Sequence, residues 1–448
     1  MKATVQPLPT GGGFVRIVEP YAHTYDTHVK ARWVGKSLLD VYCDEFGAYS
    51  REYYEAAIQS GKILLSNKQV SPHCVLQNGQ TILSHTIHLH EPAVLLDHPQ
   101  IIIIAETDEL VVVDKPATIL VHPTGSSRYN SVLTMLEERL HQKLYTIHRL
   151  DRVTSGLCLF AKSPAAAQKW SNLESNKVRK YYLARVKGKF PLNFDPDNVT
   201  RLPAENNTIT CGLHSAESVG PRKRNVLGYW TSHESLQMVF EAKQPMDLWL
   251  NNSGDDQWLH LACPTRVAAH KDGICRAGSF EDIPDDLYKK TVKASQTAFG
   301  VVSYCAETDS TVVVCKPTTG RSHQIRLHLQ FLGHPIATDG AYGGDEWFAN
   351  PDGRAACEEA RLQLSCQEVE EATDASDDEA TRRQTGEGLE DFVARTCASC
   401  RQENTTMLRF LSKSRGIWLR AIKYQMMDRL MERELMSYQA EPPVWAKM

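Results

Sequence analysis

The sequence predicts an α/β (α+β) fold in which a mixed, largely antiparallel sheet is flanked by helices. Short runs of β-branched and aliphatic residues recur along the chain, and several are joined by tight polar turns typical of hairpins. Segments with helical periodicity lie between these runs. Strands that alternate with helices, some of them linked as hairpins, favour a mixed sheet over a purely parallel one.

The N-terminal part of the chain predicts an arm and a small α/β module. Residues 1–30 mix proline, glycine and aromatics and are interpreted as an arm or edge segment. Residues 31–92 form the module: its predicted helices are 36–46 and 50–60, and its predicted strands are 62–65, 68–70 and a segment beginning at 81–83. Gly61 supplies the helix stop before the first of these strands.

The following residues predict the main sheet and its helices. Residues 101–116 (IIIIAETDELVVVDKP) contain two β-rich runs joined by a polar turn. Further strands are predicted at 157–161, 180–187, 301–304, 311–316 and 417–424, and helices at 130–141, 164–176 and 323–332.

Two stretches interrupt this pattern. Residues 192–258 carry many asparagines, prolines and glycines and have weak periodicity, so they are interpreted as an insertion. Residues 345–392 contain 15 Asp/Glu and 4 Arg and form a second, acidic insertion, interpreted as solvated and mobile. The whole chain has a net charge of −4, so the remainder carries +7. A basic body with an acidic insertion favours RNA binding more than the whole-chain charge suggests.

The composition excludes several classes of protein. No window approaches the run of about 18 apolar residues that a membrane-spanning helix requires. The first thirty residues lack the apolar core of a signal peptide, and the 12 cysteines lack the spacing of a disulfide scaffold. We therefore expect an intracellular, cytoplasmic protein without membrane contact, with mitochondrial and nuclear locations as alternatives.

The most informative segment is HRLDRVTSG at residues 148–156, which precedes a strand. It holds the carboxylate of Asp151 between Arg149 and Arg152 in a turn of small residues. Neighbouring cations keep a carboxylate ionised, as a nucleophile requires. From spacing alone, the competing interpretation is a surface turn with an Arg–Asp pair.

This segment resembles the H-R-L-D-x-x-T-S-G signature of the RluA family of RNA pseudouridine synthases and matches it at every fixed position. Other motifs of that family follow in order. They are VVDKP (112–116) with His122 and Pro123, KYYLARVKG (180–188), KASQTAF (293–299), TGRSHQIRLH (319–328) and GHPI (333–336). The segment KASQTAF has Ser295 where the family usually has alanine.

The resemblance implies a division of the chain. The catalytic domain would comprise residues 100–343 and 393–446, and the module at 31–92 resembles an S4 RNA-binding domain with a diluted basic helix face. The eukaryotic tRNA-modifying branch is similar in the segments RWVGKSLLDVYCDEF, HLHEPAV, VRKYYLARVKGKF and EPPVWA and in a late Cys-x-x-Cys.

The resemblance also implies roles for individual residues. Asp151 would be the nucleophile, Tyr182 the ring that stacks on the target uracil, and Arg326 the cation that pairs with Asp151. Arg149 would fill the gap left by the extruded base or bind phosphate. Further RNA contacts are predicted at His148, Arg152, Arg321 and Lys115.

The implied reaction is the isomerisation of uridine to pseudouridine, which consumes no water and involves no net redox change. We therefore expect no cofactor and no metal, an RNA partner and a monomer. The leading substrate hypothesis is an anticodon stem-loop uridine of tRNA at position 32. Ribosomal or mitochondrial RNA is the alternative, as is an RNA-binding or chaperone protein without turnover. Attack at C1′, attack at C6 and a glycal route all stay open.

Several other signals compete for a function. Cys397 and Cys400 have metal-ligand spacing, and Cys357 and Cys366 could complete a zinc site, but incidental thiols are favoured. His85 points away from His88 and His90 on a strand, which argues against one metal site. Two tryptophans of the first insertion, Trp249 and Trp258, are interpreted as a local core in preference to an RNA-stacking surface. Arg420 stands where the family usually has histidine; it is assigned no role, with a phosphate contact and an exposed position both open. Ile417 and Leu419 are predicted to pack beneath the active site.

Overall fold

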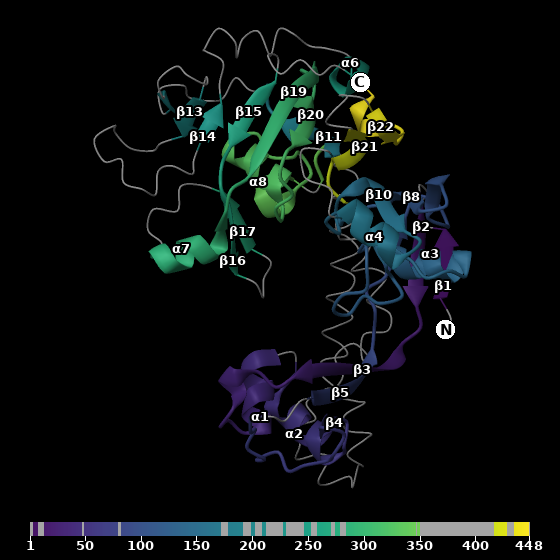
Figure 1. Ribbon diagram of the computed structural model, residues 1–448, viewed down its shortest axis with the longest axis vertical. Coiled ribbons are helices and arrows are strands. Elements are labelled where there is room, and N and C mark those ends of the chain that lie inside the picture. Colours follow the sequence, from purple (N-terminus) through teal and green to yellow (C-terminus); the bar gives the residue numbers. More distant parts are fainter. Residues whose placement is uncertain are drawn as a thin grey trace, which may run out of the picture.

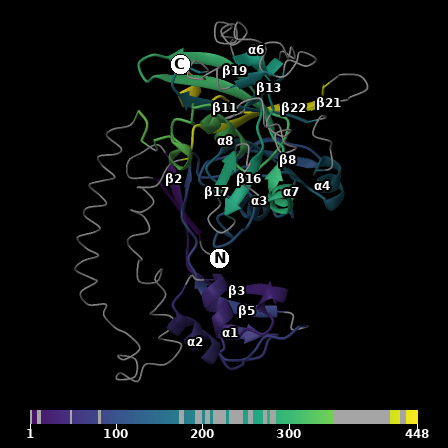
Figure 2. The same cartoon turned by 90° about the vertical axis from the view of Figure 1, so that its left-hand side faces the viewer.

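The computed structural model describes residues 3–7, 13–46, 49–78, 82–171, 178–190, 199–201, 208–211, 227–229, 246–251, 258–269, 274–277, 284–345, 347–349, 416–427 and 434–447. Figure 1 and Figure 2 show a large body at one end of the long axis and a small module at the other. Residues 357, 366, 397 and 400, the four cysteines considered for zinc, lie outside the described residues.

One long sheet organises the body. Its strand order is β12-β13-β14-β15-β19-β20-β11-β21-β10-β8-β7, with β22 beside β21 and β9 beside β10. The strands are β7 (Ile102–Glu106), β8 (Leu110–Lys115), β9 (Tyr145–Thr146), β10 (Ser155–Ala161), β11 (Val178–Lys187), β12 (Val199–Arg201), β13 (Thr208–Cys211), β14 (Leu227–Tyr229), β15 (Leu259–Ala262), β19 (Gln296–Cys305), β20 (Ser310–Pro317), β21 (Leu419–Met427) and β22 (Glu434–Gln439). The pair β10–β21 is parallel and the other described pairs are antiparallel, which confirms the predicted mixed, largely antiparallel sheet.

The central strands are buried on both faces. Val312 and Val314 of β20 pack into one hydrophobic cluster, whereas Val313 and Cys315 pack into another on the opposite face. Successive side chains of a strand point to opposite sides, so a strand covered on both sides needs a continuous apolar run. This requirement explains the uninterrupted run from 312 to 315.

Helices cover the two faces of the sheet. The helices of the body are α3 (Val132–Leu140), α4 (Pro164–Ser171), α6 (Met246–Asn251), α7 (Asp285–Thr291) and α8 (Gln324–Phe331), with short 3₁₀ turns η6 (Gly340–Tyr342) and η8 (Val444–Ala446). α3 places Leu136 in the same cluster as Val314, and α8 places Leu329 in the cluster that holds Val313. The sheet therefore has helices on opposite sides, as the sequence predicted.

α8 rests on a buried polar network. His328 Nδ1 lies 2.9 Å from Thr297 Oγ1, and His328 Nε2 lies 2.9 Å from the carbonyl oxygen of Cys263. A carbonyl only accepts hydrogen bonds, so Nε2 carries the ring proton and the imidazole is neutral. Burial lowers the pKa of His328 from 6.5 to about 4.

We expect this histidine to make the protein acid-labile. Between pH 6.5 and about 4 the unfolded chain binds a proton on His328 that the folded protein does not bind. Stability should fall by up to about 1.4 kcal/mol per pH unit as the pH decreases through this window. Urea denaturation at several pH values should give a shallower dependence for His328→Gln than for the wild type; identical slopes would contradict this prediction.

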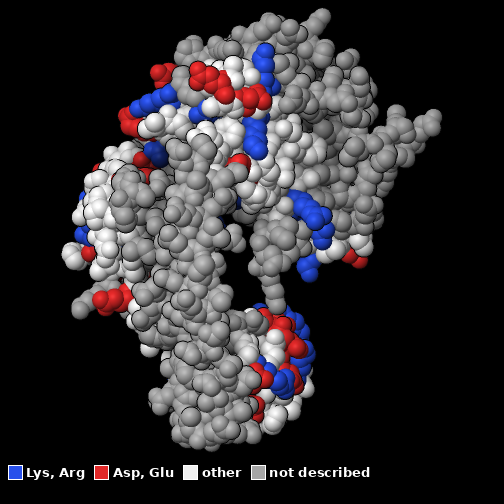
Figure 3. Space-filling view, turned by 180° about the vertical axis from the view of Figure 1, so that it is seen from behind, with Lys and Arg blue, Asp and Glu red and all other residues white. Residues whose placement is uncertain are grey.

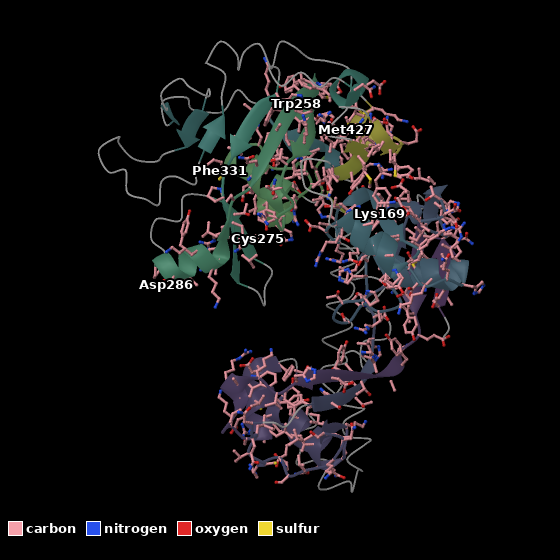
Figure 4. The ribbon with its side chains drawn as sticks, in the orientation of Figure 1. Lys169, Trp258, Cys275, Asp286, Phe331 and Met427 are labelled. Carbon is pink, nitrogen blue, oxygen red and sulfur yellow. The ribbon has the colours of Figure 1, made fainter. Side chains whose placement is uncertain are left out.

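Two small sheets lie beside the main one. The first has the order β1-β2-β6 and consists of β1 (Ala3–Pro7), β2 (Phe14–Val18) and β6 (Val94–Leu96). The second has the order β17-β16-β18 and consists of β16 (Thr265–Ala269), β17 (Ile274–Ala277) and β18 (Val292–Lys293). Leu327 of α8 packs with Cys275 of β17, which Figure 4 shows below that helix.

The small module is an α/β unit with its own core. It contains η1 (Ala31–Trp33), α1 (Leu38–Val41), η2 (Tyr42–Phe46), α2 (Arg51–Gln59), β3 (Tyr21–His28), β4 (Ile63–Leu65) and β5 (Ile82–Leu89). Ser37 and Ser50 cap α1 and α2 by accepting backbone N–H groups. The first predicted helix continues as a π-helical turn at η2.

Residues 1–30 were interpreted from the sequence as an arm or an edge segment, and their described part contains the strands β1, β2 and β3, of which β3 lies at the edge of the module's sheet. β3 pairs with β5 from Tyr21↔Leu89 to His28↔Ile82, so the module's sheet begins before residue 31. On the face seen in Figure 3, Lys/Arg and Asp/Glu side chains are intermixed over the module. The resemblance of the module to an S4 domain stays a prediction.

Part of the first insertion is core. Trp249 and Trp258 are buried, their rings meet edge to face at 4.8 Å, and Trp249 Nε1 donates to the carbonyl oxygen of Val301 at 2.8 Å. Figure 4 shows Trp258 by the upper ends of β15 and β19. The predicted core role of these rings is confirmed, and the alternative of RNA stacking is wrong.

The first residues of β10 lie tightly against β21. Gly156 has φ +109°, and a Cβ atom there would lie 2.1 Å from the carbonyl oxygen of Ala421. Gly156→Ala is therefore expected to lower the free energy of unfolding by about 2–5 kcal/mol, through backbone strain and overpacking. Thermal melts should show this loss. Gly320→Ala is the matched control because its Cβ would meet nothing within 4 Å, and an equal loss in both variants would contradict the argument.

Candidate active site

A pocket of about 490 Å³ lies where the loop before β10, the strand β11, the start of α8 and the strand β21 meet. Its lining contains most of the site residues predicted from the sequence together with further polar and aromatic groups. Among these are His148, Arg149, Asp151, Lys180, Tyr182, Arg321, His323, Arg326, Leu419 and Tyr424. Arg152 and Lys115, also predicted, do not line it among the described residues.

Asp151 sits in a loop that is held at both sides. The N–H of Thr154 donates to the carbonyl oxygen of Asp151 at 3.1 Å, and the N–H of Ile417 donates to that of Val153 at 3.0 Å. The neighbouring Leu150 is buried in the core. The side chain of Asp151 keeps 26% of its surface exposed, so the carboxylate can meet a ligand that enters the pocket.

Arg326 is the nearest cation of α8 to this carboxylate. Its Nη1 lies 3.7 Å from Asp151 Oδ2, which is ion-pair distance but too long for a hydrogen bond. Its other side makes a two-pronged pair with Asp339, where Nε donates to Oδ2 at 2.6 Å and Nη2 donates to Oδ1 at 2.8 Å. The predicted partner of Asp151 is thus held in position by a second, buried carboxylate.

The pKa of Arg326 reflects this arrangement. Burial alone would lower the pKa of the guanidinium, but the hydrogen bonds and charge of Asp339 raise it above its ordinary value. The guanidinium also lies over the Tyr342 ring, 4.6 Å from its centroid. Arg326 is therefore a permanent, oriented positive charge beside Asp151.

His323, the residue immediately before α8, also approaches Asp151. Its Nε2 lies 3.8 Å from Asp151 Oδ2, and its Nδ1 lies 2.7 Å from the hydroxyl of Tyr342. Burial lowers the pKa of His323, which favours the neutral ring. The distance to Asp151 is too long for a hydrogen bond, so the hydrogen bond of this ring is the one it shares with the Tyr342 hydroxyl.

Tyr182 brings an aromatic ring to the pocket. A β-bulge between Tyr181 and Tyr182 interrupts the pairing of β11 with β21, and bulges redirect side chains next to sites. Tyr181 is buried in the core, whereas Tyr182 is half-buried and lines the pocket. Burial, together with the nearby carboxylate of Asp151, raises the pKa of the Tyr182 phenol, so the ring stays neutral and can stack.

His148 contributes a ring and no charge. Its Nε2 accepts a hydrogen bond from the N–H of Leu159 at 3.3 Å, and the ring stacks on Tyr424 at 5.4 Å. Burial and the nearby ammonium of Lys180 lower the pKa of His148 to about 3. Any contact of His148 with RNA would therefore use a neutral imidazole.

The open side of the pocket is basic. Arg149 and Arg321 are exposed and line it, as does the half-buried Lys180. Arg321 Nε donates to the carbonyl oxygen of Ala294 at 3.0 Å, which fixes one edge of its guanidinium. Such cations would attract a phosphate backbone.

The prediction that Lys115 contacts RNA is wrong. The side chain is fully buried, and its Nζ donates to the carbonyl oxygens of Pro116 and Ile119, both at 2.8 Å, and of Arg152 at 3.2 Å. Burial lowers the pKa of this amine to about 7. Lys115 instead ties the turn after β8 to the residue that follows Asp151.

The sequence alone suggested that Arg149 and Arg152, the neighbours of Asp151 in the chain, are the cations closest to its carboxylate, and the structure differs from this. Arg152 and Arg149 are exposed, and the ion-pair distances recorded for Asp151 among the described residues lead to Arg326 and His323. The cation nearest to Asp151 among these, Arg326, therefore comes from α8, more than 170 residues later in the chain, and the neutral ring of His323 precedes that helix.

Arg420 is a buried structural residue. Its Nη2 donates to Asp114 Oδ2 at 2.5 Å and its Nε donates to the carbonyl oxygen of Glu441 at 3.0 Å. Neither alternative left open by the sequence, a phosphate contact or an exposed position, holds. Ile417 and Leu419 are buried and Leu419 lines the pocket, so their predicted place beneath the site is confirmed.

Three residues of the site were missed or given no role from the sequence: His323, Asp339 and Tyr342. His323 lies inside a recognised motif, but its φ of +55° just before α8, which turns the ring toward Asp151, is a feature of the fold. The segment ATDGAYGG (337–344) carries a hint, since an aspartate amid apolar and small residues suggests a buried pair. The spacing of residues in the sequence does not predict that Asp339 pairs with Arg326.

The described part of the chain was compared with the requirements of a metal site and of a membrane-spanning helix. No group of three or more His, Cys, Asp or Glu side chains there could hold a metal ion. No helix there is long and apolar enough to cross a membrane.

Comparison with known proteins gives one consistent family. A family model described as RNA pseudouridylate synthase matches residues 109–240 and 279–331, ranges that include Asp151, Tyr182 and Arg326. The human pseudouridylate synthase RPUSD2 is 33% identical over 337 residues, which are 75% of this chain and 47% of that protein. The chain thus spans about half the length of this relative.

Two yeast proteins are covered more fully. The mitochondrial tRNA pseudouridine(32) synthase of Saccharomyces cerevisiae is 30% identical over 437 residues, which are 97% of this chain and 77% of that protein. The tRNA pseudouridine(31) synthase of the same organism is 31% identical over 352 residues, which are 73% of this chain and 72% of that protein.

Proposed function

Since this chain belongs to the RluA family of RNA pseudouridylate synthases, in its eukaryotic tRNA branch, we propose that it isomerises uridine to pseudouridine in tRNA, with Asp151 as the nucleophile. The observation that carries the proposal is one pocket of about 490 Å³ that holds a part-exposed carboxylate, a neutral aromatic ring and an oriented guanidinium. An RNA-binding protein without turnover needs no such combination.

The reaction exchanges one bond to the ribose for another. The bond from N1 of the uracil to C1′ breaks, and a bond from C5 to C1′ forms. C5 loses its hydrogen and N1 gains one, so atoms and electrons balance without water, metal or redox cofactor. The roles below are the same whether Asp151 attacks C1′, attacks C6 or assists a glycal route.

Each group has a physical task. The target uridine has to leave its helix before either bond is accessible, and an extruded base needs a flat partner and a pocket. Tyr182 supplies a face for the uracil. Arg326, held by Asp339, brings a fixed positive charge to within 3.7 Å of Asp151 Oδ2, and the His323 ring lies 3.8 Å from the same oxygen.

The basic residues at the mouth act on the RNA backbone. Arg149 and Arg321 are exposed cations beside the pocket, and Arg152 is an exposed cation next to Asp151 in the chain. We assign phosphate contacts to all three, and to Arg149 also the task of filling the gap that the extruded base leaves. His148 would contact RNA through its neutral ring.

The two yeast relatives are named for positions 32 and 31 of tRNA, which supports our leading assignment of an anticodon stem-loop uridine at position 32. Incubation of unmodified tRNA transcripts with the protein, followed by pseudouridine mapping, should yield a single new site at 32. Wild-type protein that modifies only ribosomal RNA would contradict the tRNA assignment, and protein that modifies no RNA would favour the non-catalytic alternative.

The name of one relative bears on the cellular compartment of this protein. One yeast relative is named as mitochondrial, and we propose a cytoplasmic location with mitochondria as the alternative. We also propose that the protein acts as a monomer.

A further inference from the structure

The small module contains a second cavity, separate from the pocket around Asp151. It has a volume of about 380 Å³ and lies between the β3–β5 face, the helical segments of the module and one loop of the body. Aromatic side chains dominate its lining. The residues are Tyr25, Thr27, Tyr42, Phe46, Tyr49, Tyr54, Leu83, His85, Ile87, Leu89, His90 and Ser126.

The cavity presents flat apolar faces. Phe46 stacks on Tyr42 with ring centroids 4.8 Å apart and an angle of 27° between the planes. Phe46 is nevertheless 41% exposed, which is unusual for a phenylalanine in the middle of an aromatic cluster. Tyr49 stacks in the same way on Tyr53, at 4.1 Å and 18°. A second flat ring could extend either stack.

Within the part of the chain that the structure describes, one buried polar atom at this cavity lacks a hydrogen-bond partner. His85 is only 9% exposed, and its Nε2 makes no hydrogen bond within the described residues. Burial lowers the pKa of His85 to about 4, so the ring is neutral at physiological pH and Nε2 can serve as donor or acceptor, depending on the tautomer. An unpartnered buried polar atom is costly, and a ligand with a polar edge would remove that cost.

The cavity lies where the module meets the body. The Tyr25 hydroxyl donates to the carbonyl oxygen of Gly125 at 2.8 Å, and the next residue, Ser126, lines the cavity. Arg128 lies two residues beyond Ser126 in the same loop, so this loop also carries a cation. A ligand here would therefore meet stacking surfaces, one polar edge and a nearby cation.

We propose that this cavity binds one unstacked nucleobase of the RNA substrate, distinct from the uridine that enters the pocket around Asp151. A base offers a flat face to Phe46 and a hydrogen-bonding edge to His85, and the phosphate of the same nucleotide suits the cation of the Arg128 loop. An apolar peptide side chain would use the rings but leave His85 and Arg128 without a role. The inference rests on the proposed function in that RNA is the substrate.

The test measures RNA binding and turnover separately. Labelled unfractionated tRNA is titrated with the full-length wild type, Phe46→Ala, His85→Leu and the control Val34→Ala, which changes an equally exposed side chain outside the cavity. Phe46→Ala should weaken binding about five- to tenfold, since one base–aromatic stack is lost. His85→Leu should also weaken binding while its melting temperature stays equal or rises. Val34→Ala should bind like the wild type, and the turnover of all four proteins at saturating tRNA should be equal.

Ultraviolet cross-linking gives an independent readout. Digestion of the cross-linked wild type should yield an RNA-bearing peptide that contains Tyr42 or Phe46. Unchanged affinity of Phe46→Ala and His85→Leu, or cross-links confined to other parts of the chain, would overturn the inference. A wild type that binds tRNA through this cavity but makes no pseudouridine would instead overturn the proposed function, so the two failures can be told apart.

Discussion

Asp151→Asn is expected to abolish pseudouridine formation, with a loss of at least about a thousandfold, while tRNA affinity stays within a few-fold of the wild type. The substitution keeps the size of the side chain but removes its negative charge and its capacity to form a covalent intermediate. The loop should survive, because its anchors are the backbone N–H of Thr154 and the carbonyl oxygen of Val153.

The measurement is the initial rate of pseudouridine formation in tRNA, with affinity determined on the same preparations. Asp108→Asn is the matched control, since Asp108 is an exposed aspartate of the same body outside the pocket. A correctly folded Asp151→Asn protein that retains a tenth of the wild-type rate would exclude Asp151 as the nucleophile.

Asp339→Ala is expected to lower the free energy of unfolding by about 3–5 kcal/mol and to reduce turnover strongly. Both members of the Arg326–Asp339 pair are almost fully buried, and removal of one partner leaves the other charge uncompensated. Asp339 is a positioning residue, because it acts on Asp151 only through the guanidinium of Arg326. The variant should therefore lower kcat more than it raises KM.

A double variant separates stability from activity. Arg326→Met combined with Asp339→Leu replaces the pair with apolar side chains and should recover most of the lost stability, but it should not recover turnover. Asp44→Ala is the control for stability, since it removes one member of the exposed Lys36–Asp44 pair and should leave the melting temperature unchanged. Recovery of wild-type turnover in the double variant would show that Arg326 has no part in the reaction.

The sequence predicted the elements of the body well because local signals there are strong. The strands β8 and β20 are continuous apolar runs, and the helices α3 and α8 have clear periodicity. The first insertion was harder to interpret, since Trp249 and Trp258 lie among residues of weak periodicity and join the core only through contacts with β19.

The family motif that contains Lys115 led to a wrong prediction about the role of this residue. Lys115 belongs to a motif of the family, and a lysine near a nucleic-acid site suggests a phosphate contact. Its burial became visible only once β8 and the loop after Asp151 were brought together. Arg420 is a similar case, because its partner Asp114 lies 306 positions earlier in the chain.

By itself, the sequence determined the family, the mixed sheet and the position of Asp151, because each depends on residues that are neighbours along the chain or repeat with a short period. The family resemblance also implied Arg326 as the partner of that carboxylate, and tertiary structure alone decided what surrounds the pair. Arg326 reaches Asp151 from α8 and His323 from the residue before it, and Asp339 and Tyr342 hold them from the turn beyond that helix. Electrostatic and hydrogen-bond contacts depend on distance in space, and only the folded sheet brings these segments within 4 Å of one another.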